Sequence, residues 1–143
     1  MKTLLILLTI AISTNVYSSD RTLSVETLAI SYHYIAEGLN EEHHGLGISY
    51  YSGDHTYSAG QYLNSYNTTS TYVSFHNTLR SNSCCNVALG VILANGYSNN
   101  TTGSTTGIVL MPSIKVGVRG EVFYADLAFT PAAVGLILGA HLF

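Results

Sequence analysis

A histidine and a serine at the ends of two alternating runs are the residues best suited to do chemistry in this chain. His33 lies in AISYHY (29–34), and Asn64 and Ser65 end QYLNS (61–65). A serine hydroxyl becomes a strong nucleophile when a nearby imidazole accepts its proton, and a third group can fix the tautomer of that ring. If both runs end at one rim of the fold, His33, Ser65 and Asn64 form a candidate catalytic site. An Asn-Ser pair after a strand is also typical of an ordinary turn.

The elements that must position these residues are eight runs of about ten residues in which side-chain character alternates. Alternation with a period of two indicates β-strands. The runs cover residues 25–36, 44–52, 55–65, 69–80, 84–96, 106–117, 120–130 and 133–143. Strands that cross a bilayer need about 9–11 residues, and eight is the smallest usual number in an outer-membrane barrel. The chain is therefore predicted to be all-β, an eight-stranded antiparallel transmembrane β-barrel.

The alternation also predicts which side chains face the lumen. In the first run the inward residues are expected to be Ala29, Ser31 and His33, and the outward residues Leu28, Ile30, Tyr32 and Tyr34. In the third run the expected inward residues are Ser58, Gly60, Tyr62 and Asn64. The inward faces are small, hydroxylated or aromatic, which suits a narrow lumen. A soluble sandwich, the competing architecture, usually carries charged residues on its polar face.

Composition and the N-terminus agree with a barrel. Of the 143 residues, 47% are apolar and only 9% are charged, against about 25% charged in a typical soluble domain. The net charge of −3 and the lack of a basic stripe argue against nucleic acid as a partner. Residues 1–18 are predicted to be a signal peptide, with a positive start and an apolar run too short to span a bilayer. Residues 19–143 are then the barrel, ending in an aromatic residue, Phe143, as the last strand of such barrels often does.

The remaining residues of interest are expected to have structural roles. Cys84 and Cys85 are adjacent, and they are expected to be small residues at a strand start, because a bond between neighbours strains the peptide. The acidic and histidine run 41–44 is expected to be a solvated outer loop rather than a metal site. No metal and no cofactor are predicted.

Four segments resemble the PagP-type lipid A palmitoyltransferases, which are eight-stranded outer-membrane barrels that move an acyl chain from a phospholipid to lipid A. They are AISYHY (29–34), GLGISYYSGDHTYSAGQYLNS (45–65), VLMPSIKVGVRGEV (109–122) and AFTP (128–131). The resemblance covers most of the chain after residue 18, with few identities. It implies an enzyme of the bacterial outer membrane that is expected to be a monomer. Its expected partners are a phospholipid acyl donor and a lipid A acceptor.

The resemblance also implies roles for individual residues. His33 and Ser65 correspond to the catalytic histidine and serine, and Asn64 stands where the family has an aspartate. Pro112 and Pro131 fall where prolines flank a lateral opening for lipid between strands six and seven. Proline has no N–H to donate, so it interrupts a strand ladder.

The acyl pocket is expected to be lined by Tyr62, His76 and Gly90, with His76 near its floor. A histidine there shortens or disrupts the pocket, and Asn64 cannot stabilise an imidazolium as a carboxylate does. These two departures favour an alternative function. In that alternative the chain is a non-catalytic outer-membrane barrel that acts in adhesion, resistance or surface exclusion through loops such as 95–105.

Overall fold

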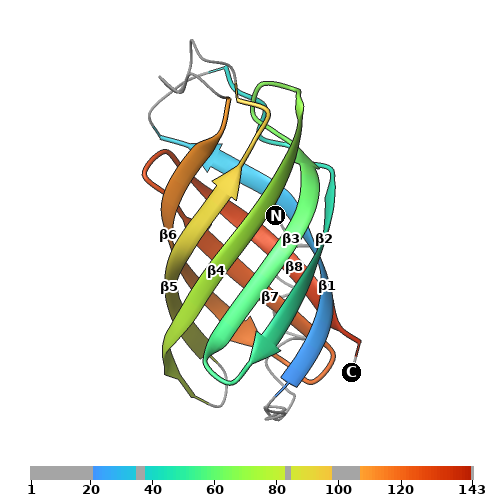
Figure 1. Cartoon of the computed structure of the whole chain (residues 1–143), viewed down its shortest axis with the longest axis vertical. Coiled ribbons are helices and arrows are strands. Elements are labelled where there is room, and N and C mark those ends of the chain that lie inside the picture. The colour runs from blue at the N-terminus through green and yellow to red at the C-terminus, as the bar shows by residue number, and fades with distance from the viewer. Residues whose placement is uncertain (1–20, 35–37, 83–84, 98–106, 143) are drawn as a thin grey trace, which may run out of the picture.

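The computed structural model describes residues 21–34, 38–82, 85–97 and 107–142, and they form a closed barrel of eight antiparallel strands (Figure 1). The strands are β1 (Arg21–His33), β2 (Gly45–Ser52), β3 (His55–Leu63), β4 (Thr69–Ser81), β5 (Cys85–Ala94), β6 (Val109–Arg119), β7 (Phe123–Phe129) and β8 (Ala133–His141). Each strand pairs with its sequence neighbours, and β1 pairs with β8 to close the ladder. Among these residues no helix is both long and apolar enough to cross a membrane.

The prediction of eight antiparallel strands in a closed barrel is confirmed, and some of the expected strand ends are corrected. β1 begins at Arg21 rather than at residue 25, because residues 21–26 pair with β2. β3 ends at Leu63, so Asn64 and Ser65 lie in the following turn. The segment 1–18 predicted to be a signal peptide, and the terminal Phe143, lie outside the described residues.

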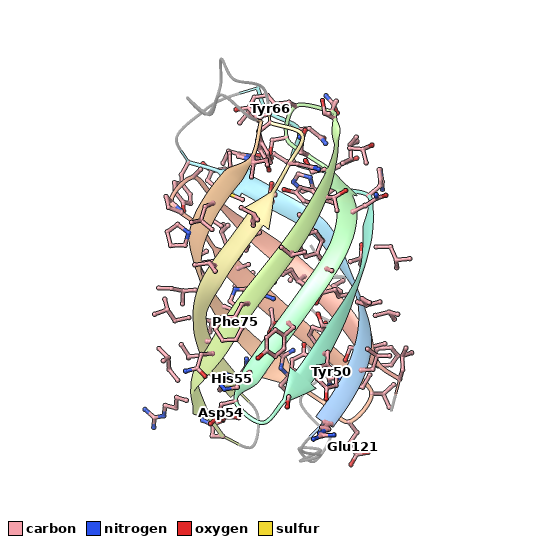
Figure 2. The ribbon with its side chains drawn as sticks, in the orientation of Figure 1. Tyr50, Asp54, His55, Tyr66, Phe75 and Glu121 are labelled. Atoms are coloured by element: carbon pink, nitrogen blue, oxygen red, sulfur yellow. The ribbon has the colours of Figure 1, made fainter. Side chains whose placement is uncertain are left out.

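The barrel has a polar interior and an apolar outer wall. The fully buried side chains are mostly polar, including Ser24, Ser49, Ser70, His76, Ser113 and Asp126. Large apolar side chains point outward from every strand between β1 and β8, including Ile30, Ile48, Tyr57, Phe75, Leu89, Leu110, Leu127 and Leu138. Figure 2 shows side chains projecting from the outer wall over the whole height of the ribbon, with Tyr66 at one end and Asp54, His55 and Glu121 at the other. The predicted polar lumen and apolar outer wall are therefore correct, with an exception in β1 described below.

A buried carboxylate joins four strands across the lumen. Glu26 of β1 accepts hydrogen bonds from Ser49 of β2, Tyr72 of β4 and Tyr124 of β7. Glycines make room for these side chains, since a Cβ on Gly47 would lie 2.2 Å from the Tyr72 hydroxyl. Because buried polar groups are costly unless they are paired, this cluster favours one packing of the lumen.

A β-bulge in β1 reverses the direction of its side chains. Up to residue 28 the even-numbered residues of β1 face the lumen, as Glu26 does. The pairing with β8 shifts between Leu28 and Ile30, and beyond this point the odd-numbered residues face inward. The expectation that Leu28 faces outward is therefore wrong: Leu28 lines the internal cavity. Bulges commonly re-aim a side chain in this way, and here His33 is one that the bulge turns inward.

The buried ion pair between Arg119 and Asp126 gives a first test of the polar lumen. Their side chains approach to 2.9 Å, and that of Asp126 is 1% exposed. Asp126→Ala is expected to lower the free energy of unfolding by about 3–5 kcal/mol, because the guanidinium then lacks its counter-charge. Urea unfolding in detergent, followed by circular dichroism, measures the change. The exposed Glu121→Ala is the control; equal stability of the two variants contradicts the assigned role of the pair.

Candidate functional site

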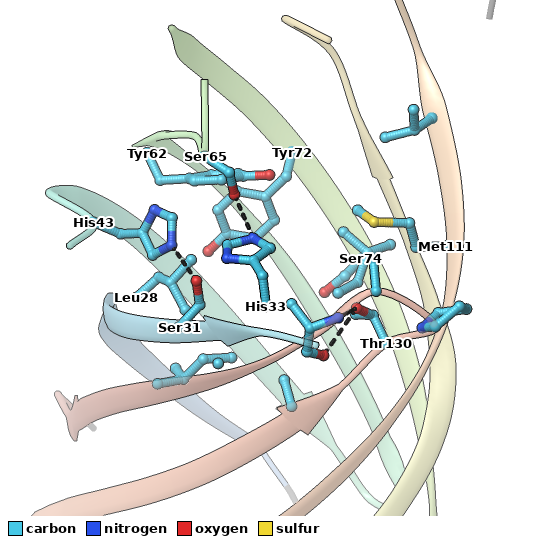
Figure 3. A pocket seen from close by; sticks show the side chains of 18 of the residues that line it. Leu28, Ser31, His33, His43, Tyr62, Ser65, Tyr72, Ser74, Met111 and Thr130 are labelled. Carbon is cyan, nitrogen blue, oxygen red and sulfur yellow. Dashed lines mark hydrogen bonds between the residues drawn. The ribbon is translucent and has the colours of Figure 1, made fainter. Parts of the chain in front are cut away.

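The candidate site is a cavity of about 430 Å³ at the end of the barrel where β1 and β3 finish (Figure 3). One side carries serine and histidine side chains from β1 and from the segments that follow β1 and β3, namely Ser31, His33, His43 and Ser65. The other side is apolar and comes mainly from β6, β8 and the connection between β7 and β8, including Val109, Met111, Pro112, Pro131, Ala132 and Ile137. An apolar cavity with a few convergent polar groups is the usual form of a binding site.

His33 and Ser65 meet in this cavity, as the candidate site predicts. The Ser65 hydroxyl lies 2.7 Å from His33 Nε2. His33 is the last residue of β1, and Ser65 is the second residue after β3. The two side chains therefore come from the ends of β1 and β3, which are separated in the sheet by β2. The geometry allows His33 to accept the serine proton.

The hydrogen bonds of the Asn64 side chain go to the turn that carries Ser65 and to its neighbours, and not to the His33 ring. Its Oδ1 accepts hydrogen bonds from the backbone N–H groups of Tyr66 (2.9 Å) and Thr68 (3.0 Å). Its Nδ2 donates to Ser70 Oγ and to the Gly96 carbonyl, both at 3.0 Å. With both ends of the amide engaged, Asn64 is a structural residue of the turn. His33 Nδ1 is buried and has no hydrogen-bond partner among the described residues.

A second serine–histidine pair, which the sequence reasoning did not identify, lies beside the first (Figure 3). Ser31 Oγ is 2.7 Å from His43 Nε2, and His43 Nδ1 is 2.6 Å from the Leu63 carbonyl oxygen. The available signal was the inward parity of Ser31, two residues before His33 on the same face. The run 41–44 was read as a solvated loop, yet His43 is 5% exposed while His44 is exposed.

The lining of the cavity reaches the outer wall where β6 runs beyond the end of β7. The pairing of these strands starts only at Ile114 and Phe129, so the first five residues of β6 have no ladder partner on β7. Leu110 is 67% exposed on the outer wall and also lines the cavity, and Pro112 is likewise both exposed and part of the lining. Pro131 lies opposite, beyond the end of β7, and lines the cavity as well. This stretch at the two prolines, here called the seam, therefore contributes residues both to the cavity and to the outer wall.

The cavity ends on polar groups in the middle of the lumen. Glu26, Tyr72 and Lys115 are among its lining residues. His76 and Gly90, which were expected to line an acyl pocket, lie outside this lining. His76 is fully buried, its Nε2 lies 2.6 Å from Ser113 Oγ, and it packs where a Cβ on Gly90 would stand.

Tyr62, the third residue of the expected acyl pocket, does line the cavity, near its mouth. Its hydroxyl lies 2.7 Å from that of Tyr97, and its ring packs edge-on against His43. Burial raises the pKa of Tyr97, and the neighbouring Tyr62 adds to the effect. A phenol is neutral at physiological pH even at its ordinary pKa of about 10, so Tyr97 can donate a hydrogen bond.

The residues present do not suggest a metal centre. Within the described ranges no group of three or more His, Cys, Asp or Glu side chains could hold a metal ion. Cys85 begins β5 with an exposed side chain, and Cys84 lies outside those ranges. No protein-family model matches the chain, and no curated protein matches it.

The hydrogen bonds of Asn64 give a second test. Asn64→Ala is expected to lower the free energy of unfolding by about 1–3 kcal/mol, because Ser70 and the turn N–H groups lose a buried partner. Asn64→Asp is also expected to destabilise, because a carboxylate cannot donate to the Gly96 carbonyl. Urea unfolding measures both, with the exposed Gln61→Ala on β3 as the control. If Asn64→Asp were neutral, the donor role of the amide would be excluded.

Proposed function

We propose that this protein is an acyltransferase of the bacterial outer membrane, of the lipid A palmitoyltransferase type. It takes a fatty acyl chain from a phospholipid and transfers it to lipid A. The observation that carries the proposal is the hydrogen bond of 2.7 Å between Ser65 and His33 at the mouth of an apolar cavity. The resemblance in four sequence segments supports the same function.

The outer surface supports a place in the membrane. Side chains such as Leu46, Leu79 and Leu110 are more than 60% exposed on the wall, which in water would leave a large apolar surface uncovered. Monomeric soluble proteins rarely expose contiguous apolar patches larger than a few hundred Å². Apart from stretches such as the start of β6, the strands of this closed barrel satisfy their ladder hydrogen bonds with one another and so tolerate hydrocarbon around them. In this proposal the strands cross the bilayer, and the mouth of the cavity lies at one membrane surface.

The seam between β6 and β7 supports a lipid substrate. A phospholipid in the surrounding leaflet could place one acyl tail past Leu110 and Pro112 without leaving the membrane. The apolar side of the cavity then receives the tail, and the serine and histidine side receives the ester. Glu26, Tyr72 and Lys115 stop the tail in the middle of the lumen, since hydrocarbon gains nothing from contact with charged and hydroxyl groups.

The chemistry follows from the paired side chains. His33 Nε2 can accept the proton of Ser65 as the serine oxygen attacks the ester carbonyl. Alternatively, it can accept the proton of a lipid A hydroxyl that attacks directly. General-base assistance of this kind contributes a factor on the order of 10²–10⁴ in rate. Both routes end with the acyl chain on the acceptor and a lysophospholipid as the second product.

Expression of the protein in a Gram-negative host tests the function. Lipid A is expected to gain one acyl chain, seen by mass spectrometry of the extracted lipid. Both His33→Ala and Ser65→Ala are expected to reduce this product by a factor on the order of 10² or more. The control for the histidine is His55→Ala, an exposed histidine at the opposite end of the barrel. Unchanged lipid A on expression of the folded parent protein rejects the acyltransferase.

A non-catalytic barrel that acts through its surface loops is the second candidate. It is favoured by the engagement of Asn64 in its turn and by the absence, among the described residues, of a hydrogen-bond partner for His33 Nδ1. The greater part of the loop 95–105, which this candidate needs, lies outside the described residues. Under this candidate, a deletion in that loop abolishes the surface phenotype and His33→Ala leaves it intact.

A further inference from the structure

Ser31 and His43 form a serine–histidine pair with a more complete set of contacts than Ser65 and His33. We propose that Ser31 is the nucleophile that accepts the acyl chain, with His43 as its base and the Leu63 carbonyl as the orienting group. The inference rests on the proposed acyltransferase function. It replaces attack by Ser65 with attack by Ser31, and it keeps His33 and Ser65 as groups that bind the acceptor hydroxyl.

The contacts of His43 determine its tautomer. The Leu63 carbonyl oxygen can only accept a hydrogen bond, so the Nδ1 atom that lies 2.6 Å away must carry the proton. In the neutral ring Nε2 is then an acceptor, and the Ser31 hydroxyl at 2.7 Å donates to it. This is the arrangement of a catalytic triad, with a backbone carbonyl in the place of the carboxylate.

The backbone holds both members of the pair in place. The His43 N–H donates to the Ala29 carbonyl at 3.2 Å, and the Ser31 N–H donates to the Glu41 carbonyl at 2.8 Å. These bonds tie the segment after β1 to the part of β1 that follows its bulge. His43 is only 5% exposed, yet both its ring and the Ser31 side chain line the cavity. The base is therefore shielded from water while its nucleophile reaches the substrate space.

Among the described residues, the first pair has no such orienting group. His33 Nδ1 is buried without a hydrogen-bond partner among the described residues, and Asn64 is bound within its own turn. In catalytic triads the group that holds Nδ1 is worth several orders of magnitude in rate. Ser31 and His33 lie two residues apart on one face of β1 (Figure 3). The Ser65–His33 pair thus stands beside the nucleophile, where it can hold the acceptor hydroxyl by hydrogen bonds.

In the acyl transfer to Ser31, one ester bond forms as another breaks, and one proton passes through His43. The Ser31 proton passes to His43 Nε2 as Oγ bonds to the ester carbon, and the carbonyl electron pair moves to its oxygen. When that pair returns, the bond to the glycerol oxygen breaks, and the departing oxygen takes the proton from His43. A lysophospholipid leaves, and an acyl ester of Ser31 remains.

The second half-reaction reverses these steps with a new alcohol. A lipid A hydroxyl gives its proton to His43 Nε2, and its oxygen bonds to the acyl carbon. The bond to Ser31 Oγ then breaks, and Oγ takes the proton back from His43. The protein returns to its starting state with no oxidant, reductant or cofactor consumed.

A long-chain alkyl fluorophosphonate tests which serine is the nucleophile, because the attacking oxygen displaces fluoride and keeps the probe. The folded full-length protein in detergent is labelled, digested and mapped by mass spectrometry. The adduct is expected on Ser31. His43→Ala is expected to reduce labelling by a factor on the order of 10² or more, while the exposed neighbour His44→Ala leaves it unchanged. Ser65→Ala is expected to keep the label on Ser31.

The outcomes separate this inference from the proposed function. Labelling of the unsubstituted protein on Ser65 alone, or no labelling of a preparation that acylates lipid A, overturns the role of Ser31. This readout does not require any variant to fold. Labelling on Ser31 that depends on His43 supports the dyad even if lipid A is unchanged on expression. Unchanged lipid A would then overturn the acyltransferase function alone, and the Ser31–His43 pair would stand.

Discussion

The buried carboxylate of Glu26 is the interaction on which the arrangement of the lumen depends. It accepts hydrogen bonds from hydroxyl groups on three other strands, β2, β4 and β7. A charged group in the interior is tolerated only when such partners surround it. The cluster therefore fills the middle of the barrel and sets the depth of the cavity above it. The space available to a ligand is the part of the lumen between this cluster and the rim.

The serine and histidine side chains at the rim are positioned by the irregular part of β1. Up to the bulge, β1 pairs regularly with β2 and presents Glu26 to the lumen. Beyond it the ladder with β2 opens, and an isolated bridge joins Ile30 to Glu42 in the segment that precedes β2. This opening lets the following segment fold back and place His43 over Ser31. It also gives both serine–histidine pairs one common support, because the end of β3 supplies the Leu63 carbonyl to one pair and Ser65 to the other.

The cavity joins two kinds of surface that one lipid could occupy at once. Its apolar side includes Leu110 and Pro112, which are also exposed on the outer wall, and its polar side carries the two histidines. A substrate with a hydrocarbon tail and an ester matches both sides. This match, together with the hydrogen bond between Ser65 and His33, connects the fold with acyl transfer in the proposed function. A role through surface loops would use none of these features.

The sequence alone determined the number of strands, their antiparallel order and most of the side-chain directions. These properties follow from a period of two, which is local, and the inward positions of His33, Tyr62 and His76 could be predicted from it. The tertiary structure decided the strand ends, the bulge that turns Leu28 inward and the contacts of Asn64, because these depend on pairing with neighbouring strands. It also decided that His43 meets Ser31. That contact arises where a regular ladder fails, and a local periodicity carries no information about such a place.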